Sequence, residues 1–280
     1  MKLATVRLED RTQAVRVDGA IATEIQGAAS VDALLQDPAW RGRAAQAKGR
    51  THQLDAPGAP MLAPVVTHPS KVLCVGLNYR AHITEMKREM PQYPTLFAKW
   101  ADCLAGPYDD VPIPPEASGH VDWEGELAVI IGRDVRRARG REAAAAIAGY
   151  AVSDDVSMRD WQFRTREWLQ GKVWGASTPL GPTLTTPDEM PSGAQLVTRL
   201  DGEEMQRGRI DDLVFGPAEL VEYCSTILPL RAGDVIITGT PGGVGNARDP
   251  QVFLAPGHVV EVQIDGVGTL RNRFVAERVA

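Results

Sequence analysis

The stretch Val121-Asp122-Trp123-Glu124-Gly125-Glu126-Leu127-Ala128-Val129-Ile130-Ile131-Gly132 decides how the rest of the chain is organised. Its second half, Leu127 to Ile131, is an unbroken apolar run that stops at a glycine, which predicts a buried β-strand. Side chains two positions apart in a strand point to the same face, so Glu124 and Glu126 are expected side by side where the strand enters the core. Two carboxylates about 4 Å apart repel by roughly 4 kcal/mol at an effective dielectric constant near 20. A fold tolerates such a pair when water screens it, when a proton is shared, or when a cation lies between the two groups.

A second stretch, Ala151 to Ser157, follows another short apolar segment and brings a third carboxylate to the set. Carboxylate oxygens without Cys or His nearby are ligands for Mg²⁺, Mn²⁺ or Ca²⁺ rather than for zinc. The alternative is an ordinary solvated surface, since charged residues are mostly exposed. The residues alone leave both interpretations open.

Composition sets the outer bounds. A chain of 280 residues that is 44% hydrophobic can form one large core, or one core with a small appended unit. The net charge of −6 and the absence of a Lys/Arg tract argue against a nucleic-acid partner. Three widely spaced cysteines indicate a reducing compartment. The N-terminal residues hold no apolar signal region and no run reaches membrane-spanning length, so we expect a cytoplasmic protein without membrane contact.

The order of elements predicts two units. Short strands within residues 2–8, 13–17 and 21–25 form a β-meander, and a proline-rich linker spans residues 55–69. We therefore expect a small N-terminal α+β domain over residues 1–65 and a catalytic domain over residues 66–280. Further along, residues 160–170 predict one helix that buries two tryptophans, Trp161 and Trp168, on one face.

Three further signals concern chemistry. His82 and Glu85 are three apart on a predicted helix and share a face, so the carboxylate can orient the imidazole as a base; an ordinary surface pair is the alternative. The glycine-rich loop 239–245 is no phosphate-binding P-loop, because no Lys-Ser/Thr follows the glycines. Its backbone N–H groups and the Thr240 hydroxyl either face an anion, or the loop is a turn that needs positive φ.

Several motifs then occur together in a fixed order. They are Gly76-Leu77-Asn78-Tyr79 with His82 and Glu85, Phe97-Ala98-Lys99, Asp122-Trp123-Glu124-Gly125-Glu126-Leu127, Asp154-Asp155-Val156-Ser157-Met158-Arg159-Asp160 with Gln162, Lys172, and Gly233 to Gly245. Over roughly residues 70–275 the chain resembles the fumarylacetoacetate hydrolase family, in particular its short acylpyruvase-like and 2-hydroxyhepta-2,4-diene-1,7-dioate isomerase-like members. The resemblance implies a β-rich α+β fold, a roll of mixed β-sheets with a small N-terminal domain, and a homodimer.

The resemblance also implies roles for individual residues. It implies a Mg²⁺ or Mn²⁺ site, with Ca²⁺ as a further possibility, at Glu124, Glu126 and Asp155. It implies catalytic roles for His82, Glu85 and Lys172, the first two on a segment that closes over substrate. It implies substrate contacts from Lys99, Arg159, Gln162, Gly239 and Thr240.

The expected reaction is hydrolysis of a carbon–carbon bond in a 2,4-dioxo acid such as an acylpyruvate. His82, held by Glu85, would remove a proton from water, and the resulting hydroxide would attack the distal carbonyl. The metal and Lys172 would stabilise the pyruvate enolate that leaves. Two alternatives use the same metal–enolate site without an attacking water: an oxaloacetate-type decarboxylase and a 2-hydroxydienoate isomerase. A metal-binding scaffold without turnover is the alternative from another class.

Some positions depart from the common family pattern. Asp154 stands where an Asn is frequent and adds a negative charge beside the predicted metal site. Lys172-Val173-Trp174-Gly175 replaces a Lys-x-Phe-Asp pattern, and Asp201 stands where Asn-Gly-Glu usually begins. The predicted pocket wall around residues 174–178 therefore bears on the choice of substrate.

Overall fold

The computed structural model describes residues 1–85, 89–117 and 119–278. Its strands form an eleven-stranded sheet, a five-stranded sheet and a two-stranded ribbon. The strands of the large sheet are, in spatial order, β4 (Thr51–Gln53), β3 (Ile21–Glu24), β2 (Thr12–Asp18), β1 (Lys2–Arg7), β13 (Thr178–Thr185), β11 (Ile147–Asp154), β10 (Gly125–Ile131), β16 (Val235–Ile237), β5 (Val72–Gly76) and β6 (Thr95–Lys99), with β7 (Leu104–Ala105) pairing with β13 beside this path. The large sheet is mixed, because β16 and β5 run parallel while most of its pairs are antiparallel.

The other strands are fewer. The five-stranded sheet has the order β15 (Glu203–Arg209), β14 (Gln195–Leu200), β17 (Val259–Ile264), β18 (Gly268–Ala276) and β8 (Val111–Ile113), and the ribbon pairs β12 (Ser157–Met158) with β9 (Val121–Asp122). The α-helices are α1 (Val31–Leu35), α2 (Trp40–Ala45), α3 (Arg80–Glu85), α4 (Arg141–Ala145), α5 (Arg159–Gln162), α6 (Leu169–Lys172) and α7 (Pro217–Ile227). The short 3₁₀ helices are η1 (Ala101–Cys103), η2 (Pro115–Ala117), η3 (Pro187–Glu189), η4 (Ile210–Asp212) and η5 (Gly245–Ala247).

Strand β10 lies in the core, as its apolar run predicts, and every one of its residues is buried. Leu127 packs with residues of the five-stranded sheet, whereas Ile130 belongs to a cluster on the opposite face that includes Leu34 of α1. Val129 and Ile131 pack with residues of α7. A strand that is covered on both faces has no polar side to alternate with, which explains the continuous apolar sequence.

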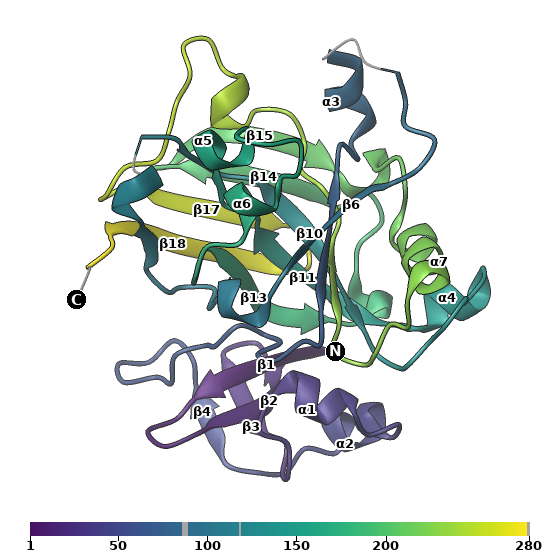
Figure 1. Cartoon of the computed structure of the whole chain (residues 1–280). Helices are drawn as coiled ribbons and strands as arrows, with labels where there is room; N and C mark the ends of the chain where they lie inside the picture. Colours follow the sequence, from purple (N-terminus) through teal and green to yellow (C-terminus); the bar gives the residue numbers. More distant parts are fainter. Residues whose placement is uncertain (86–88, 118, 279–280) are drawn as a thin grey trace.

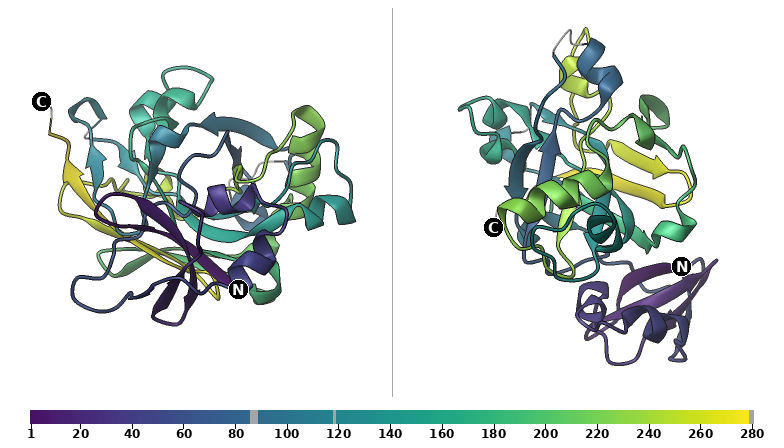
Figure 2. Two further views of the ribbon diagram at one scale, coloured as in Figure 1. Left: turned by 90° about the horizontal axis from the view of Figure 1, so that it is seen from below. Right: turned by 90° about the vertical axis from the view of Figure 1, so that its right-hand side faces the viewer.

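The N-terminal strands form the lower lobe of the molecule, together with α1 and α2 (Figures 1 and 2). This lobe contains the predicted meander, since β1 pairs with β2 and β2 with β3 in antiparallel fashion. Strand β1 also pairs with β13, with Leu3 opposite Leu184, so the meander extends the large sheet. The division of the chain into domains near residue 65 stays a prediction.

The predicted single helix over residues 160–170 is wrong. The segment forms two short helices, α5 and α6, separated by residues 163–168. Within the interruption the Thr165 hydroxyl donates a hydrogen bond of 3.0 Å to the carbonyl of Glu167. Local side-chain bonds of this kind compete with the helical pattern. Within the residues that the structure describes, no helix has the length and apolar character needed to cross a membrane.

Candidate active site

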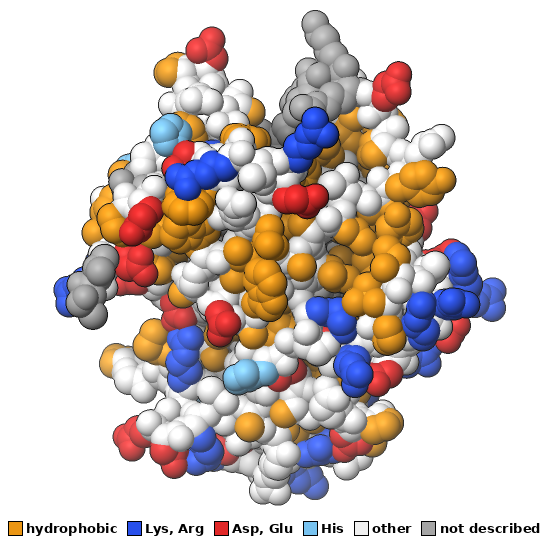
Figure 3. All heavy atoms as spheres, in the orientation of Figure 1, with side chains coloured by type: hydrophobic (Ala, Val, Ile, Leu, Met, Phe, Trp, Pro, Cys, Tyr) orange, Lys and Arg blue, Asp and Glu red, His pale blue; other side chains and the backbone are white. Residues whose placement is uncertain are grey.

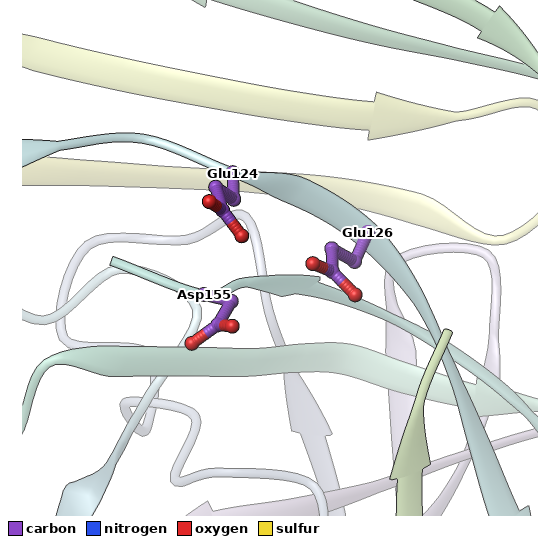
Figure 4. Close-up of side chains that lie close together, drawn as sticks. All are labelled: Glu124, Glu126 and Asp155. Atoms are coloured by element: carbon purple, nitrogen blue, oxygen red, sulfur yellow. The ribbon is translucent and has the colours of Figure 1, made fainter. Parts of the chain in front are cut away.

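Strand register brings together three carboxylates that are far apart in the sequence. Strands β10 and β11 are antiparallel, and Gly125 pairs with Asp154. Glu124 therefore lies opposite Asp155, and the Asp155 N–H donates to the Glu124 carbonyl at 2.9 Å. Glu126 follows two positions later on the same face. One oxygen from each of Glu124, Glu126 and Asp155 lies within 4.8 Å of the others, and Figure 4 shows the three carboxyl groups gathered around one space.

Among the described side chains, Glu126 is the member of this carboxylate triad without an ion pair. Its side chain is 2% exposed, and among the ion pairs of the described side chains none involves it. Its carboxylate accepts a hydrogen bond from the Gly239 N–H. Burial raises the pKa of Glu126 well above its ordinary value, and repulsion from Asp155 and Glu124 adds to this. A hard divalent cation would remove this penalty, so the donor set fits Mg²⁺, Mn²⁺ or Ca²⁺.

Lys172 joins the other two carboxylates. Its Nζ donates to Glu124 Oε2 and to Asp155 Oδ2, both at 2.8 Å, and its side chain is almost fully buried. Burial alone would lower the pKa of Lys172, but attraction to Asp155 and Glu124 outweighs it and raises the pKa above its ordinary value. The amine is therefore a protonated donor at neutral pH, held beside the triad.

Lys99 lies behind Asp155. Its Nζ is 2.6 Å from Asp155 Oδ1 and donates to Thr178 Oγ1 at 2.6 Å, with the side chain completely buried. Burial would raise the pKa of Asp155, yet Lys172 and Lys99 together lower it. Lys99 does not line the cavity described below. Its contact with substrate stays a prediction, while the structure shows it paired with Asp155, whose ionised form this pairing favours.

Arg159 and Gln162 are brought together on α5. Arg159 Nη1 lies 2.7 Å from Glu124 Oε1 and donates to Gln162 Oε1 at 2.8 Å. On its other side Arg159 contacts Asp122 Oδ2 through Nε and Nη2, at 2.8 and 2.7 Å. Burial would lower the pKa of Arg159, but attraction to Glu124 and Asp122 outweighs it and raises the pKa. Both residues line the cavity, and their contact with substrate stays a prediction.

Asp122 is a site residue that the sequence analysis missed. It is fully buried, and besides Arg159 it accepts hydrogen bonds from the N–H groups of Gly245 (2.7 Å) and Asn246 (3.0 Å). It thereby fixes Arg159 and one wall of the cavity to each other. The signal was present, because Asp122, Glu124 and Glu126 alternate along the strand.

Asp154, the residue that departs from the family pattern, points into the protein interior beside the triad. Its Oδ1 accepts a hydrogen bond of 2.8 Å from the Glu124 N–H, and its Oδ2 has no partner. Burial raises the pKa of Asp154 to about 7, with the Glu124 N–H opposing this shift and repulsion from Asp155 adding to it. The extra negative charge expected at this position is therefore partly suppressed near neutral pH.

The glycine-rich loop combines both of its predicted features. Gly239 and Gly243 have φ values of +98° and +102°, the conformation that favours glycine. The Gly239 N–H also faces an anion, which is the Glu126 carboxylate of the chain itself. Thr240 lines the cavity, but its hydroxyl donates to the Gly125 carbonyl (2.9 Å) and accepts from Gln206 (2.8 Å). No sequence signal pointed to Gln206, which comes from the distant strand β15.

A cavity of about 380 Å³ opens onto Glu124 and Glu126, two members of the triad. Its polar lining consists of Glu124, Glu126, Arg159, Gln162, Lys172, Thr240 and Asn246, and the rest is Val75, Gly76, Leu77, Phe97, Phe163, Trp168, Val244 and Ala247. Trp168 thus faces the cavity instead of the predicted buried helix face, because the helix is interrupted before it. The prediction that residues 174–178 form a wall of the pocket is also wrong, since none of them is among the described residues that line the cavity. Trp174 packs edge-on against Trp161, and Ser177 and Thr178 are buried.

The predicted pair His82 and Glu85 belongs to α3, next to the cavity-lining residues 76 and 77 in the sequence. The side chains of both residues lie outside the part of the chain that the structure describes. Their catalytic roles, and closure of the segment over substrate, stay predictions.

Comparison with known proteins settles the family. The sequence pattern of the family described as "Fumarylacetoacetate (FAA) hydrolase C-terminal" matches residues 71–275, which is most of the chain. The chain belongs to the fumarylacetoacetate hydrolase family. This match includes the triad, Lys172 and the whole cavity lining. It confirms the resemblance drawn from the motifs.

Individual relatives of this family member differ in their stated activities. Human mitochondrial oxaloacetate tautomerase FAHD2A is 43% identical over 218 residues, covering 76% of this chain and 69% of the relative. A solved 5-carboxymethyl-2-hydroxymuconate delta-isomerase from Mycobacterium smegmatis is 32% identical with a TM-score of 0.82, covering 99% and 100% of the two chains. A fumarylacetoacetate hydrolase from Exiguobacterium antarcticum is 29% identical with a TM-score of 0.87 and the same coverage. These structures confirm the predicted β-rich fold, and family membership supports the prediction of an enzyme.

Proposed function

We propose that this protein is a divalent-metal-dependent isomerase that interconverts the enol and keto forms of a 2-oxo acid, with oxaloacetate as the leading candidate. The observation that carries the proposal is the triad of Glu124, Glu126 and Asp155 with the Lys172 amine bonded to two of its members. The names of the tautomerase and isomerase relatives support isomerisation over the predicted acylpyruvate hydrolysis. Mg²⁺ or Mn²⁺ is the proposed cofactor, and Ca²⁺ is chemically compatible with the same ligands.

A divalent cation held by the triad would supply Lewis acidity toward the 2-oxo oxygen and carboxylate of the substrate. The other contributions come from the chain. Lys172 stays protonated and places a positive charge beside the position where enolate charge develops. Arg159 and Gln162 line the same side of the cavity, where they can orient the substrate carboxylate.

The balance of the reaction explains why isomerisation demands less of the site than hydrolysis. The enol O–H proton leaves, a proton is added at C3, and the C=C bond becomes C–C as the C–O bond becomes C=O. No water attacks the substrate, so no activated nucleophile is required. His82 remains the predicted proton-transferring residue, with Glu85 as its orienting partner, and His82→Ala tests that role.

The deciding experiment follows enol absorbance and pyruvate together. Protein stripped with chelator is assayed with oxaloacetate and with simple acylpyruvates, with and without Mg²⁺ or Mn²⁺, and Glu124→Gln is the control. Metal-dependent loss of the oxaloacetate enol without pyruvate supports the isomerase. Pyruvate from oxaloacetate would assign a decarboxylase, and pyruvate from acylpyruvates the predicted hydrolase. Absence of turnover on every substrate would favour a metal-binding scaffold.

Two further expectations extend the proposal. On the face shown in Figure 3, hydrophobic side chains gather above the N-terminal lobe, and exposed apolar patches are typical of protein–protein interfaces. This supports the proposed homodimer, which light scattering tests.

The cytoplasmic location stays a prediction, and the relatives' names include "mitochondrial". We propose that the protein binds neither nucleic acid nor a membrane.

A further inference from the structure

The lining of the cavity combines a charged cluster with aromatic rings. Three residues form the charged cluster, since Glu124 contacts both Lys172 and Arg159. Aromatic rings adjoin this cluster. Lys172 Nζ lies 5.3 Å from the centre of the Phe97 ring. The Phe97 ring in turn meets the Trp168 ring edge-on, at 5.8 Å between centres and an interplanar angle of 74°.

Gly76 makes room for the Trp168 ring. A Cβ added to Gly76 would lie 2.3 Å from Cζ3 and 2.8 Å from Cη2 of Trp168, closer than any real contact. Gly76 ends strand β5, and the ring packs on its backbone at the cavity wall. The absence of a side chain at residue 76 therefore sets how far the indole is withdrawn from the cavity.

We propose that Trp168 is a specificity-determining residue and that the cavity accepts 2-oxo acids that carry an apolar, aromatic substituent on C3. This rests on the proposed isomerase function and adds a substrate class to it. A 2-oxo-carboxylate head group matches the charged cluster of Glu124, Lys172 and Arg159. The described lining also offers the rings of Phe97, Phe163 and Trp168, with which an aromatic group gains the edge-to-face contacts that aromatic pairs prefer.

The size of the cavity agrees with this substrate class. Its volume of about 380 Å³ lies within the range of small-molecule sites, which are mostly apolar with a few polar groups that fix orientation. The chemistry is unchanged from the proposed function. The enol O–H bond breaks, a C3–H bond forms, and no other reactant is needed.

The test compares two substrates in four proteins. The enol forms of oxaloacetate and of phenylpyruvate, the aromatic probe, are offered to the Mg²⁺- or Mn²⁺-loaded wild type, Trp168→Ala, Gly76→Ala and the double variant. Trp168→Ala is expected to lower kcat/KM for phenylpyruvate about tenfold, mainly through KM, because one aromatic contact is lost. The ratio of kcat/KM for phenylpyruvate to kcat/KM for oxaloacetate is therefore expected to fall, since oxaloacetate carries no ring that loses this contact.

Gly76→Ala gives an independent readout. The added methyl group pushes the indole into the cavity, so kcat/KM is expected to fall more for phenylpyruvate than for oxaloacetate. In the Trp168→Ala background the same change is expected to have no further effect, because the clashing ring is gone. Trp100→Ala is the matched control, since Trp100 is 52% exposed and does not line the cavity.

The outcomes separate this inference from the proposed function. If the wild type turns over neither enol, the isomerase proposal fails. If it turns over oxaloacetate and not phenylpyruvate, the function stands and the aromatic substrate class is overturned. An equal loss on both substrates in Trp168→Ala, or additive effects in the double variant, would show that Trp168 acts only on the fold.

Discussion

Replacement of Asp154 by Asn should stabilise the metal-free protein, and the gain should depend on pH. The pKa of Asp154 is about 7 in the folded protein against 3.8 for the free side chain. Between these values the folded state binds more protons than the unfolded state, so stability falls as pH rises through this window. Each pH unit costs about 1.36 kcal/mol, and the loss is complete above pH 7. An Asn keeps an acceptor for the Glu124 N–H and carries no charge.

The gain should therefore be about 2 kcal/mol larger near pH 8 than near pH 5.5, because roughly 1.5 pH units of the window lie above the lower pH. Urea unfolding of chelator-treated wild type and variant at both pH values measures the difference. Asp10→Asn is the control, since the Asp10 side chain is 80% exposed. A gain that is the same at both pH values would refute the reasoning, because it would mean that Asp154 does not titrate between them.

Three other substitutions test the site. Glu126→Gln should raise the melting temperature of the metal-free protein near pH 8, because the pKa of Glu126 is raised well above its ordinary value and its ionisation opposes folding. The same substitution should abolish the increase in melting temperature that Mn²⁺ causes. An unchanged increase with Mn²⁺ would contradict the role of Glu126 as a ligand. Lys172→Gln should lower kcat about 10²–10³-fold, as loss of one donor to developing negative charge does, while calorimetry still detects metal; unchanged kcat would remove Lys172 from the chemistry. Gly125→Ala should lower the free energy of unfolding in urea by about 1–3 kcal/mol, because the added Cβ would lie 2.3 Å from Thr198 Oγ1. A stable variant with normal metal affinity would show that the strand can shift without moving the two glutamates.

Local sequence rules predicted the central strand and two members of the triad. An apolar run bounded by glycine is sufficient for β10, because both of its faces are covered. The alternation of side chains then places Glu124 and Glu126 together. Asp155 required more, since its position depends on the pairing of Gly125 with Asp154 across two strands that lie far apart in the sequence. Its role came from the family motif.

The remaining site residues depend on tertiary structure. Gln206 reaches the site from β15, where it accepts from the Gly125 N–H at 3.1 Å and donates to Thr240, and no local pattern marks it. Trp168 was assigned to a helix face because it lies seven residues after Trp161. The interruption at residues 163–168 cancels that periodicity, and the ring turns to the cavity. Periodicity predicts a shared face only while the helix continues.

The charges around the triad explain how its residues could hold a divalent cation. Asp155 is held ionised by Lys99 and Lys172, and Glu124 is paired with Lys172 and Arg159. Among the described residues Glu126 has no ion pair and accepts a hydrogen bond from the Gly239 N–H, and a buried carboxylate without a cationic partner is costly. A cation bound to Glu126 would remove this free-energy cost of burial. It would therefore bind the folded state more tightly and stabilise the protein by mass action. We therefore expect metal affinity and the stability of the metal-free fold both to depend on the buried Glu126 carboxylate, so Glu126→Gln should change both together.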